Sequence, residues 1–342
     1  MGQQGADETM IGSPLIIAEA GVNHNGDLAR ALALVDAAVD AGADVVKFQA
    51  FRAEGLVTED ADTVAYQASN TGQDNQAELL RALELSQDDF ETIAAQCAKV
   101  GIEFLCTPFD VAMTADLVAM GMKRIKVASG ELTNLPALRH FAAFDLPIIL
   151  STGMATLADV GEALEALEEV KETVTCLHCT SLYPAPIETL NLRAMTTMAE
   201  AFDVPVGYSD HSLGDHAAIA ATALGASVIE KHFTLDRTLP GPDHMASLEP
   251  SELRTMVARI RDTAKALGDG VKQPTDQERE TAALVRRSWH TRRAVSGGSV
   301  IAAADLVLKR PADGLPPAQS PEGHRLIHDL AADRPVTAAD IE

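Results

Sequence analysis

Short runs of branched apolar residues alternate with longer segments of helical periodicity along most of the chain. In Asp27–Gly42, for example, apolar residues recur at spacings of three and four, which is the pattern of one buried helix face. The strands that we predict are Leu15–Ala20, Asp44–Ala50, Ile102–Thr107, Arg124–Ser129, Pro147–Thr152, Val174–Thr180, Pro205–Ser209 and Ser227–Phe233. Eight strand–helix units in about 250 residues are typical of a (β/α)8 barrel, an α/β fold. An open doubly wound sheet is the alternative, but no G-x-G-x-x-G follows any predicted strand.

Two polar stretches interrupt this alternation and divide the chain into parts. The first, Arg52–Glu78, is interpreted as a lid over a binding site, because loops of this length are usually functional or mobile. The second, Gly268–Arg287, is polar and charged, and we interpret it as a linker. We therefore predict an N-terminal tail at 1–13, the barrel at 14–267, a linker at 268–289 and a small second domain at 290–342. A domain of about 50 residues is too small to be very stable alone, so it is expected to pack against a barrel, its own or a partner's.

The charge of the chain argues against two classes of partner, nucleic acids and anionic membranes. Lys and Arg number 27 against 50 Asp and Glu, which gives a net charge of −23. A nucleic-acid partner or an anionic membrane would need a basic surface. The acidity fits either a salt-adapted enzyme or an ordinary acidic surface. No apolar run reaches the roughly 18 residues of a membrane span, and the first residues lack the pattern of a signal peptide, so a cytoplasmic protein is expected.

Polar residues follow nearly every predicted strand, at the end where barrel enzymes place their chemistry. Lys47 and Lys126 lie inside otherwise apolar strands, where a charge must be paired or must face a ligand. Hydroxyl residues at the other strand ends include Thr107, Ser129, Ser151, Ser181, Tyr183 and Ser209. Two lysines among hydroxyls indicate an anion site, most simply for a phosphate and a carboxylate. Internal ion pairs with Glu19 and Glu230 are the alternative.

Two histidines follow the seventh and eighth strands. Adjacent strands lie about 4.8 Å apart, so His211 and His232 could share a divalent transition metal such as manganese or cobalt. A hydrogen-bonded pair of core histidines explains the spacing at least as well. Cys176 and Cys179 face opposite sides of a strand, so a metal or redox role is not expected for them.

A series of motifs in fixed order resembles the sialic acid synthase family, whose members condense phosphoenolpyruvate with an N-acylated hexose. The motifs are IIAEAGVNHNG at 16–26, VVKFQ at 45–49, FLCTPFD at 104–110, KVASGE at 126–131, LSTGM at 150–154, YPAP at 183–186, GYSDH at 207–211, EKHF at 230–233 and PGPDH at 240–244. The resemblance covers residues 14–342. It implies a (β/α)8 barrel followed by a small antifreeze-like (SAF) domain, in a domain-swapped homodimer.

The resemblance also implies roles for individual residues. Glu19 matches the acid/base residue, while His211 and His232 match the ligands of a divalent metal, Mn²⁺ first and Mg²⁺ or Co²⁺ as alternatives. The phosphoenolpyruvate-binding set is Lys47, Thr107, Lys126, Ser129, Ser151, Ser181 and Ser209. The sugar-binding set is Gln49, Tyr183, Glu230, Asp243 and, from the partner subunit, this chain's Arg310. Some family members have Asn at the position of Ser181, and the loop 312–314 departs from the Gly-rich family pattern.

The family contains several sugar specificities that these motifs do not separate. The first expectation is an N-acetylneuraminate synthase, a transferase that uses N-acetylmannosamine and releases phosphate. The alternative is an N,N'-diacetyllegionaminate synthase that uses 2,4-diacetamido-2,4,6-trideoxymannose, and the stretch Asn23–Gly26 looks less like the pseudaminic branch. Alternatives of other classes are a metal-dependent pyruvate aldolase, which would release no phosphate, and a non-catalytic sugar-binding barrel.

Overall fold

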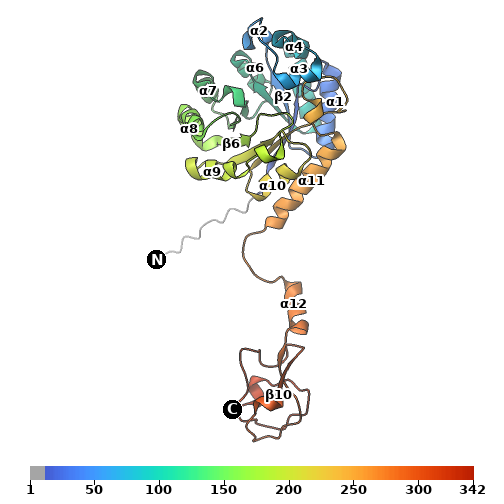
Figure 1. Ribbon diagram of the computed structural model, residues 1–342, viewed down its shortest axis with the longest axis vertical. Helices are drawn as coiled ribbons and strands as arrows, with labels where there is room; N and C mark the ends of the chain where they lie inside the picture. The colour runs from blue at the N-terminus through green and yellow to red at the C-terminus, as the bar shows by residue number, and fades with distance from the viewer. Residues whose placement is uncertain (1–11) are drawn as a thin grey trace. The chain divides into compact units, whose positions relative to one another are not determined.

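A computed structural model describes residues 12–342 and divides them into two units (Figure 1). The first unit ends at Asp269, and the second is Gly270–Glu342. The tail predicted at 1–13 lies outside the described residues except for its last two positions. The division falls within the segment 268–289, which was predicted to be a linker. That segment also contains a helix, α12 (Asp276–Val285), which the polar sequence did not indicate.

The first unit is built on eight parallel strands arranged around a ring. These strands are β1 (Leu15–Gly21), β2 (Val45–Ala50), β3 (Glu103–Pro108), β4 (Ile125–Val127), β5 (Ile148–Ser151), β6 (Val174–Cys179), β7 (Val206–Asp210) and β8 (Val228–His232). The hydrogen-bonded order is β3-β2-β1-β8-β7-β6-β5-β4, and β3 and β4 lie next to each other where the ring closes. The predicted (β/α)8 barrel is confirmed. The largest difference concerns β4, because Ser129 begins a short 3-10 helix instead of ending the strand.

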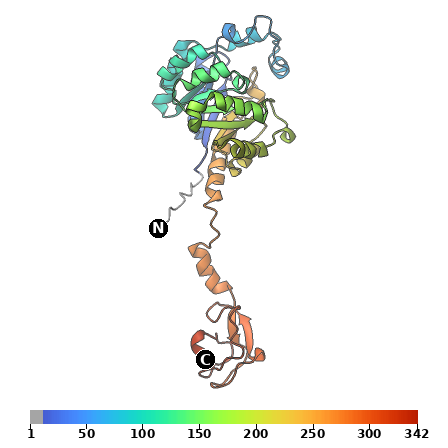
Figure 2. The same ribbon diagram turned by 90° about the vertical axis from the view of Figure 1, so that its left-hand side faces the viewer.

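Helices cover the outside of this ring, as Figures 1 and 2 show. They are α1 (Leu28–Ala41), α5 (Gln87–Val100), α6 (Thr114–Ala119), α7 (Leu135–Ala142), α8 (Leu157–Ala166), α9 (Arg193–Phe202), α10 (His216–Ala223) and α11 (Pro250–Leu267). The apolar face expected for α1 was Leu28, Ala31, Leu32, Val35 and Val39. Of these, Ala31 and Val35 are buried and the other three are partly buried, because the fully buried face also contains Leu34, Ala38 and Ala41. In the described part of the chain, no helix is long and apolar enough to cross a membrane.

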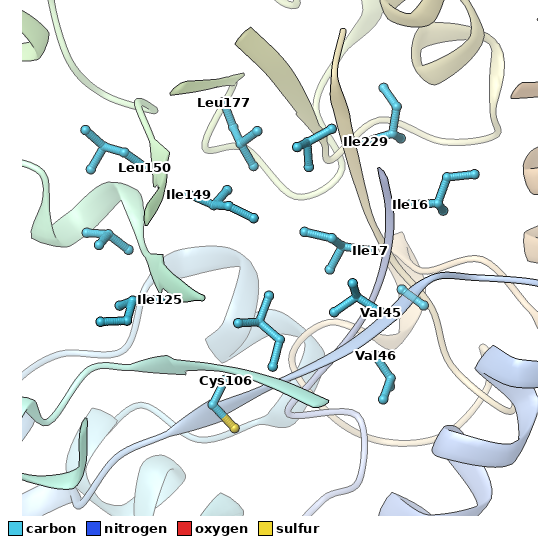
Figure 3. Packing of buried hydrophobic residues seen from close by; sticks show 14 of the residues in the cluster. Ile16, Ile17, Val45, Val46, Cys106, Ile125, Ile149, Leu150, Leu177 and Ile229 are labelled. Carbon is cyan, nitrogen blue, oxygen red and sulfur yellow. The ribbon is translucent and has the colours of Figure 1, made fainter. Parts of the chain in front are cut away.

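The core follows from the alternation of side chains along each strand. Figure 3 shows Ile17 and Ile149 on the inner side of their strands, and Ile16 and Leu150 on the outer side, toward the helices. All four side chains are almost completely buried. Strands with apolar residues on both faces are expected where a parallel sheet is enclosed by helices. The inner face therefore starts as a packed apolar core at the amino end of the strands.

The segment interpreted as a lid is more ordered than its sequence pattern suggested. It contains the helices α2 (Ala53–Leu56) and α3 (Ala65–Thr71) and the start of α4 (Gln76–Leu83), which lie together beside the barrel in Figure 1. α3 buries none of its residues. The Asn70 side chain donates a hydrogen bond to the carbonyl of Pro242 (2.8 Å) and so connects α3 to the loop after β8.

The second unit has a small core of its own. Its strands β9 (Ser288–Thr291) and β10 (Leu306–Lys309) are antiparallel, and its buried apolar residues are Ile301, Leu306, Leu326 and Val336. Residues 290–342 contain only short 3-10 helices in addition to these strands. A core of four buried side chains is consistent with the limited stability expected for a domain of this size.

Candidate active site

The carboxyl ends of the strands surround a cavity of about 270 Å³. Most of the predicted site residues line it: Glu19, Lys47, Gln49, Thr107, Lys126, Ser129, Ser151, Ser181, Tyr183, Ser209, His211, Glu230 and His232. Two predicted residues do not. Asp243 is buried beside the cavity, with Oδ2 3.9 Å from Nδ1 of His232. Arg310 is an exposed residue of the second unit.

Strand register explains why residues far apart in sequence converge. Glu19 of β1 lies opposite Lys47 of β2 and opposite His232 of β8. Ser209 of β7 lies opposite Glu230 of β8 in the same way. All of these residues face inward at the carboxyl ends of their strands, and Glu19, Lys47 and Glu230 each lie two positions beyond an apolar inward residue. The polar layer of the barrel therefore rests directly on its apolar core.

The first lysine, Lys47, is held by a carboxylate and a hydroxyl. Its Nζ lies 2.6 Å from Oε2 of Glu19 and donates to Oγ1 of Thr107 at 3.0 Å. Glu230 is farther away, at 3.7 Å, and Gln49 donates a hydrogen bond to Oε1 of Glu19 at 3.1 Å. The ion pairs considered as an alternative in the sequence are therefore present. They occur within the cavity, so they do not remove Lys47 from the surface that a ligand would contact.

The second lysine, Lys126, lies farther from a carboxylate than Lys47 does. Its Nζ donates to Oγ of Ser151 at 2.7 Å and lies 3.6 Å from Oε1 of Glu230. The Ser209 hydroxyl donates to the same Oε1 atom at 2.8 Å. Two ammonium groups and a row of hydroxyls thus face one buried space, which is the donor set that a phosphate and a carboxylate require.

The pKa values of the two buried carboxyl groups are shifted in opposite directions. Burial raises the pKa of Glu19, although the neighbouring ammonium group of Lys47 opposes this shift. Burial acts in the same direction on Glu230, but the charges of Lys126 and Lys47 outweigh it and lower the pKa of Glu230 to about 2. When the environment separates two carboxyl pKa values, the group with the higher value is suited to proton transfer and the other stays ionised. Glu19 is the one suited to acid/base work.

The two histidines lie edge to face, with ring centroids 5.6 Å apart. The Nδ1 atom of His211 is 2.8 Å from the carbonyl oxygen of Thr180, to which it donates as the Nδ1–H tautomer, so Nε2 carries the lone pair. Tyr183 stacks on His211 at 4.1 Å, with its hydroxyl 3.1 Å from Nε2. Burial is the largest cause that lowers the pKa of both imidazoles to about 3, so both rings are neutral.

This arrangement fits a divalent metal with two protein ligands. Neutral imidazole is the form that binds a metal, and a second ring nitrogen anchored on a backbone carbonyl is the usual support. The buried Nδ1 of His232 has no hydrogen-bond partner, which leaves a polar atom of the site unsatisfied. Among residues 12–342 no group of three or more His, Cys, Asp or Glu is placed to hold a metal ion.

Several lining residues were not predicted from the sequence. Tyr66 of α3 stacks on Tyr183 with ring centroids 5.2 Å apart, and Val64, Phe109 and Met154 form the apolar part of the wall. The only signal for Tyr66 in the sequence was its position, as an aromatic residue in the segment interpreted as a lid. These residues lie on α3 or in loops between the strands and helices, and the strand pattern does not indicate the course of either.

One glycine is required by the close packing of this wall. A Cβ atom on Gly153 would lie 2.2 Å from Oγ of Ser181 and 2.8 Å from Oγ of Ser129. The Gly153 N–H instead donates to the Ser129 hydroxyl at 3.0 Å. The loop after β5 can therefore approach both serines only because this residue has no side chain.

Comparison with known proteins identifies the family. The model of the NeuB family matches residues 34–272, which is more than half of the chain. The chain belongs to the NeuB family. A SAF domain model matches residues 286–342, as the sequence resemblance implied. The predicted family, its two-part architecture and the prediction of a condensing synthase are thereby confirmed.

Similar proteins cover most of the chain. The N,N'-diacetyllegionaminic acid synthase of Legionella pneumophila is 46% identical over 93% of this chain and 91% of its own length. The N-acetylneuraminate-9-phosphate synthase of Homo sapiens is 36% identical over 75% of this chain and 72% of its own length. A crystal structure of N-acetylneuraminic acid synthetase from Leptospira borgpetersenii has a TM-score of 0.72 at 36% identity and covers 79% of this chain and 90% of that chain.

Proposed function

We propose that the protein condenses phosphoenolpyruvate with 2,4-diacetamido-2,4,6-trideoxymannose and water to give N,N'-diacetyllegionaminate and phosphate. The observation that carries the reaction is the cavity in which two buried lysines and several hydroxyls face a pair of neutral imidazoles. The choice of sugar is supported by the relative from Legionella pneumophila, whose identity of 46% exceeds the 36% of the human relative. N-Acetylmannosamine, the first expectation from the sequence, becomes the second candidate.

In this proposal the lysine layer binds phosphoenolpyruvate. Lys47 and Lys126 neutralise its carboxylate and phosphate, and Thr107 and Ser151 already hold these two ammonium groups in position. The remaining hydroxyls of the set, which can donate hydrogen bonds to the anion, are Ser129, Ser181 and Ser209. Held in this way, C3 of phosphoenolpyruvate faces the sugar carbonyl, and orientation supplies a large part of the rate acceleration.

In this proposal Glu19 carries out the proton transfers of the reaction. Carbon–carbon bond formation turns the sugar carbonyl into a hydroxyl, which needs a proton, while water adds at C2 and loses one as phosphate leaves with its bridging oxygen. Glu19 has the raised pKa among the two carboxyl groups and lies next to Lys47 in the cavity. Glu230 stays ionised between the lysines and, with Gln49, Tyr183 and Asp243, is proposed to contact the sugar.

A divalent metal on His211 and His232 would supply Lewis-acid activation of the sugar aldehyde. We propose Mn²⁺ first, with Co²⁺ and Mg²⁺ as alternatives, because imidazole ligands suit a transition metal better than magnesium. The chain itself anchors His211 on the carbonyl of Thr180 and packs Tyr183 against its ring.

Phosphate release with two sugars tests the proposal. The purified protein, phosphoenolpyruvate and Mn²⁺ are mixed with the trideoxy diacetamido sugar and, in parallel, with N-acetylmannosamine, and the product is identified by its mass. We expect phosphate and product mainly with the first sugar. Lys126→Met should abolish the signal, whereas Lys123→Met, which removes an exposed lysine three positions away, should not.

Three outcomes of this assay would change the conclusion. Product with N-acetylmannosamine alone would select the second candidate within the same reaction class. Product formed without phosphate release when pyruvate replaces phosphoenolpyruvate would instead indicate an aldolase. An absence of product with either sugar, at low and at molar salt, would contradict the function and leave the fold unaffected.

We also propose that the protein is a domain-swapped homodimer in which Arg310 reaches the partner's sugar site. In support, apolar side chains in the loops at the carboxyl ends of the strands are exposed, among them Met154 (77%), Met245 (59%) and Leu213 (54%). Mixing a Lys47→Met chain with an Arg310→Ala chain is expected to restore activity, because mixed dimers would contain one intact site. A mixture as inactive as its components would contradict the swap. A cytoplasmic location stays a prediction from the sequence.

A further inference from the structure

A second buried ion pair lies between β7 and β8, on the outer face of the barrel wall. Asp210 and Lys231 are opposite each other in the strand register, and both side chains are fully buried. Neither lines the cavity, because the side-chain alternation that turns Ser209 and Glu230 inward turns these two outward. Each immediately precedes one of the two histidines, His211 or His232.

The contacts of this pair fix the backbone on both sides of His211. Nζ of Lys231 lies 2.8 Å from Oδ2 of Asp210 and also donates to the carbonyl oxygen of Ser212. Oδ1 of Asp210 accepts hydrogen bonds from the Ser212 N–H at 2.9 Å and the Ser212 hydroxyl at 2.7 Å. We call Asp210, Ser212 and Lys231 the outer clamp. It joins the residues before and after His211 to the residue before His232.

Stability alone does not explain why charges are placed here. A buried ion pair loses hydration on both partners, and well-packed apolar residues of similar size usually stabilise a protein as well or better. The neighbouring outward residues Ile16 and Ile229 are apolar, so the wall could be packed without charge. Unlike apolar packing, the hydrogen bonds of the clamp are directional, so they fix the ends of two adjacent strands relative to each other.

We propose that the outer clamp is a set of positioning residues that hold the two histidines at the separation a shared divalent metal requires. The inference rests on the proposed function, since that function assigns the metal to these histidines. Loss of groups that support metal ligands typically lowers metal affinity about 10- to 100-fold. The hydrogen bonds of the clamp join its own three residues and reach neither the imidazole rings nor the proposed phosphoenolpyruvate-binding residues, so its loss should act on metal binding more than on phosphoenolpyruvate binding.

The test measures the dissociation constant of Mn²⁺ from the electron paramagnetic resonance signal of free Mn²⁺. The double variant Asp210→Asn/Lys231→Met removes both charges together and avoids leaving one unpaired. We expect its dissociation constant for Mn²⁺ to rise about tenfold or more. Its affinity for phosphoenolpyruvate without metal, measured by calorimetry, should stay within about twofold of wild type because Lys47 and Lys126 are unchanged.

A matched pair elsewhere in the barrel serves as the control. Glu103 and Arg124 also connect neighbouring strand segments, through contacts of 2.6 and 3.0 Å, but at the amino end of β3 and β4. Glu103→Gln/Arg124→Met should leave the dissociation constant of Mn²⁺ within about twofold, whatever it does to the melting temperature. An equal rise in both double variants would overturn the proposal, because it would show a general loss of stability.

Two further variants keep the proposal decidable if the first double variant does not fold. Ser212→Ala removes one hydroxyl contact and should raise the dissociation constant of Mn²⁺ about threefold, whereas Lys231→Arg retains the charge and should come closer to wild type. If a folded clamp variant binds Mn²⁺ with unchanged affinity, the positioning role of the clamp is contradicted and the proposed function is not affected. A wild-type protein that binds no divalent metal would contradict both the proposed metal site and this inference.

Discussion

The inner face of the barrel has two halves with opposite chemistry on the same strands. Ile17 of β1 and Ile149 of β5 point inward in Figure 3, and Glu19 and Ser151, two residues farther along the same strands, line the cavity. All four side chains are buried to a similar extent. The amino half is closely packed hydrocarbon, while the carboxyl half consists of charges and hydroxyls around a cavity.

The difference shows where this chain gives up stability for function. Burying apolar surface contributes about 25 cal/mol per Å², whereas burying an ion pair is often neutral or unfavourable. The carboxyl half nevertheless contains Lys47 and Lys126 with two carboxylates in one enclosed space. Substitutions two residues apart on one strand should therefore affect different properties of the protein.

The largest effect is expected at the polar half of β1. Glu19→Gln should lower kcat by about 10²- to 10⁴-fold, because the proposed acid/base group is lost. The chain should remain folded, since Glu230 still lies 3.7 Å from Lys47 and neutralises it. Steady-state phosphate release and circular dichroism are the measurements. A kcat within threefold of wild type would remove Glu19 from the reaction.

The fold could be predicted from the sequence because each strand carries a strong apolar run. β1 was expected at Leu15–Ala20 and extends to Gly21. The prediction failed where tertiary contacts decide the structure. α3 buries no residue and shows no apolar stripe, so nothing in its sequence distinguished it from a polar loop. α12 lacks buried residues as well and was taken as part of a linker.

The candidate site could be predicted only as far as it lies on strands. A lysine such as Lys47 in an apolar strand is visible in the sequence, and strand order brings it to Glu19. Tyr66 was missed because its contact with Tyr183 depends on how the segment interpreted as a lid folds back. The pairing of Asp210 with Lys231 was missed because it requires the exact register of β7 and β8.

The next effect is expected at the apolar half of the same strand. Ile17→Ala should lower the free energy of unfolding by about 2–5 kcal/mol, since it deletes buried methyl groups and leaves a cavity. Urea denaturation measures this change. Under conditions where the variant is folded, its kcat should stay within about threefold of wild type. A loss of kcat much larger than threefold in the folded variant would mean that the apolar half also determines activity.

The smallest effect concerns a buried histidine just beyond the end of β1. Burial lowers the pKa of His24 to about 4, and its Nδ1 accepts a hydrogen bond from the Gly26 N–H at 3.0 Å. In the unfolded chain His24 binds a proton near pH 6.5, whereas in the folded chain it binds one only near pH 4. His24 therefore lowers the stability of the folded state as the pH falls from about 6.5 to 4. The full difference is about 3 kcal/mol.

Denaturation of His24→Asn across this pH range tests that expectation. The free energy of unfolding of the variant should fall less than that of wild type between pH 6.5 and 4. The reason is that Asn does not titrate, so the unfolded chain no longer gains a proton at position 24. Replacement of the exposed His324 by Asn is the control and should leave the profile of wild type unchanged. If His24→Asn and wild type have parallel profiles, His24 does not contribute to the acid sensitivity of the fold.

The central claim is that the polar half of the strands is a phosphoenolpyruvate and metal site. A crystal structure with phosphoenolpyruvate and Mn²⁺, recorded with anomalous scattering at the manganese edge, tests it most directly. We expect an anomalous peak between His211 and His232 and the phosphoenolpyruvate anion in contact with Lys47 and Lys126. Phosphoenolpyruvate bound elsewhere, or manganese on other residues while this cavity holds neither, would contradict it.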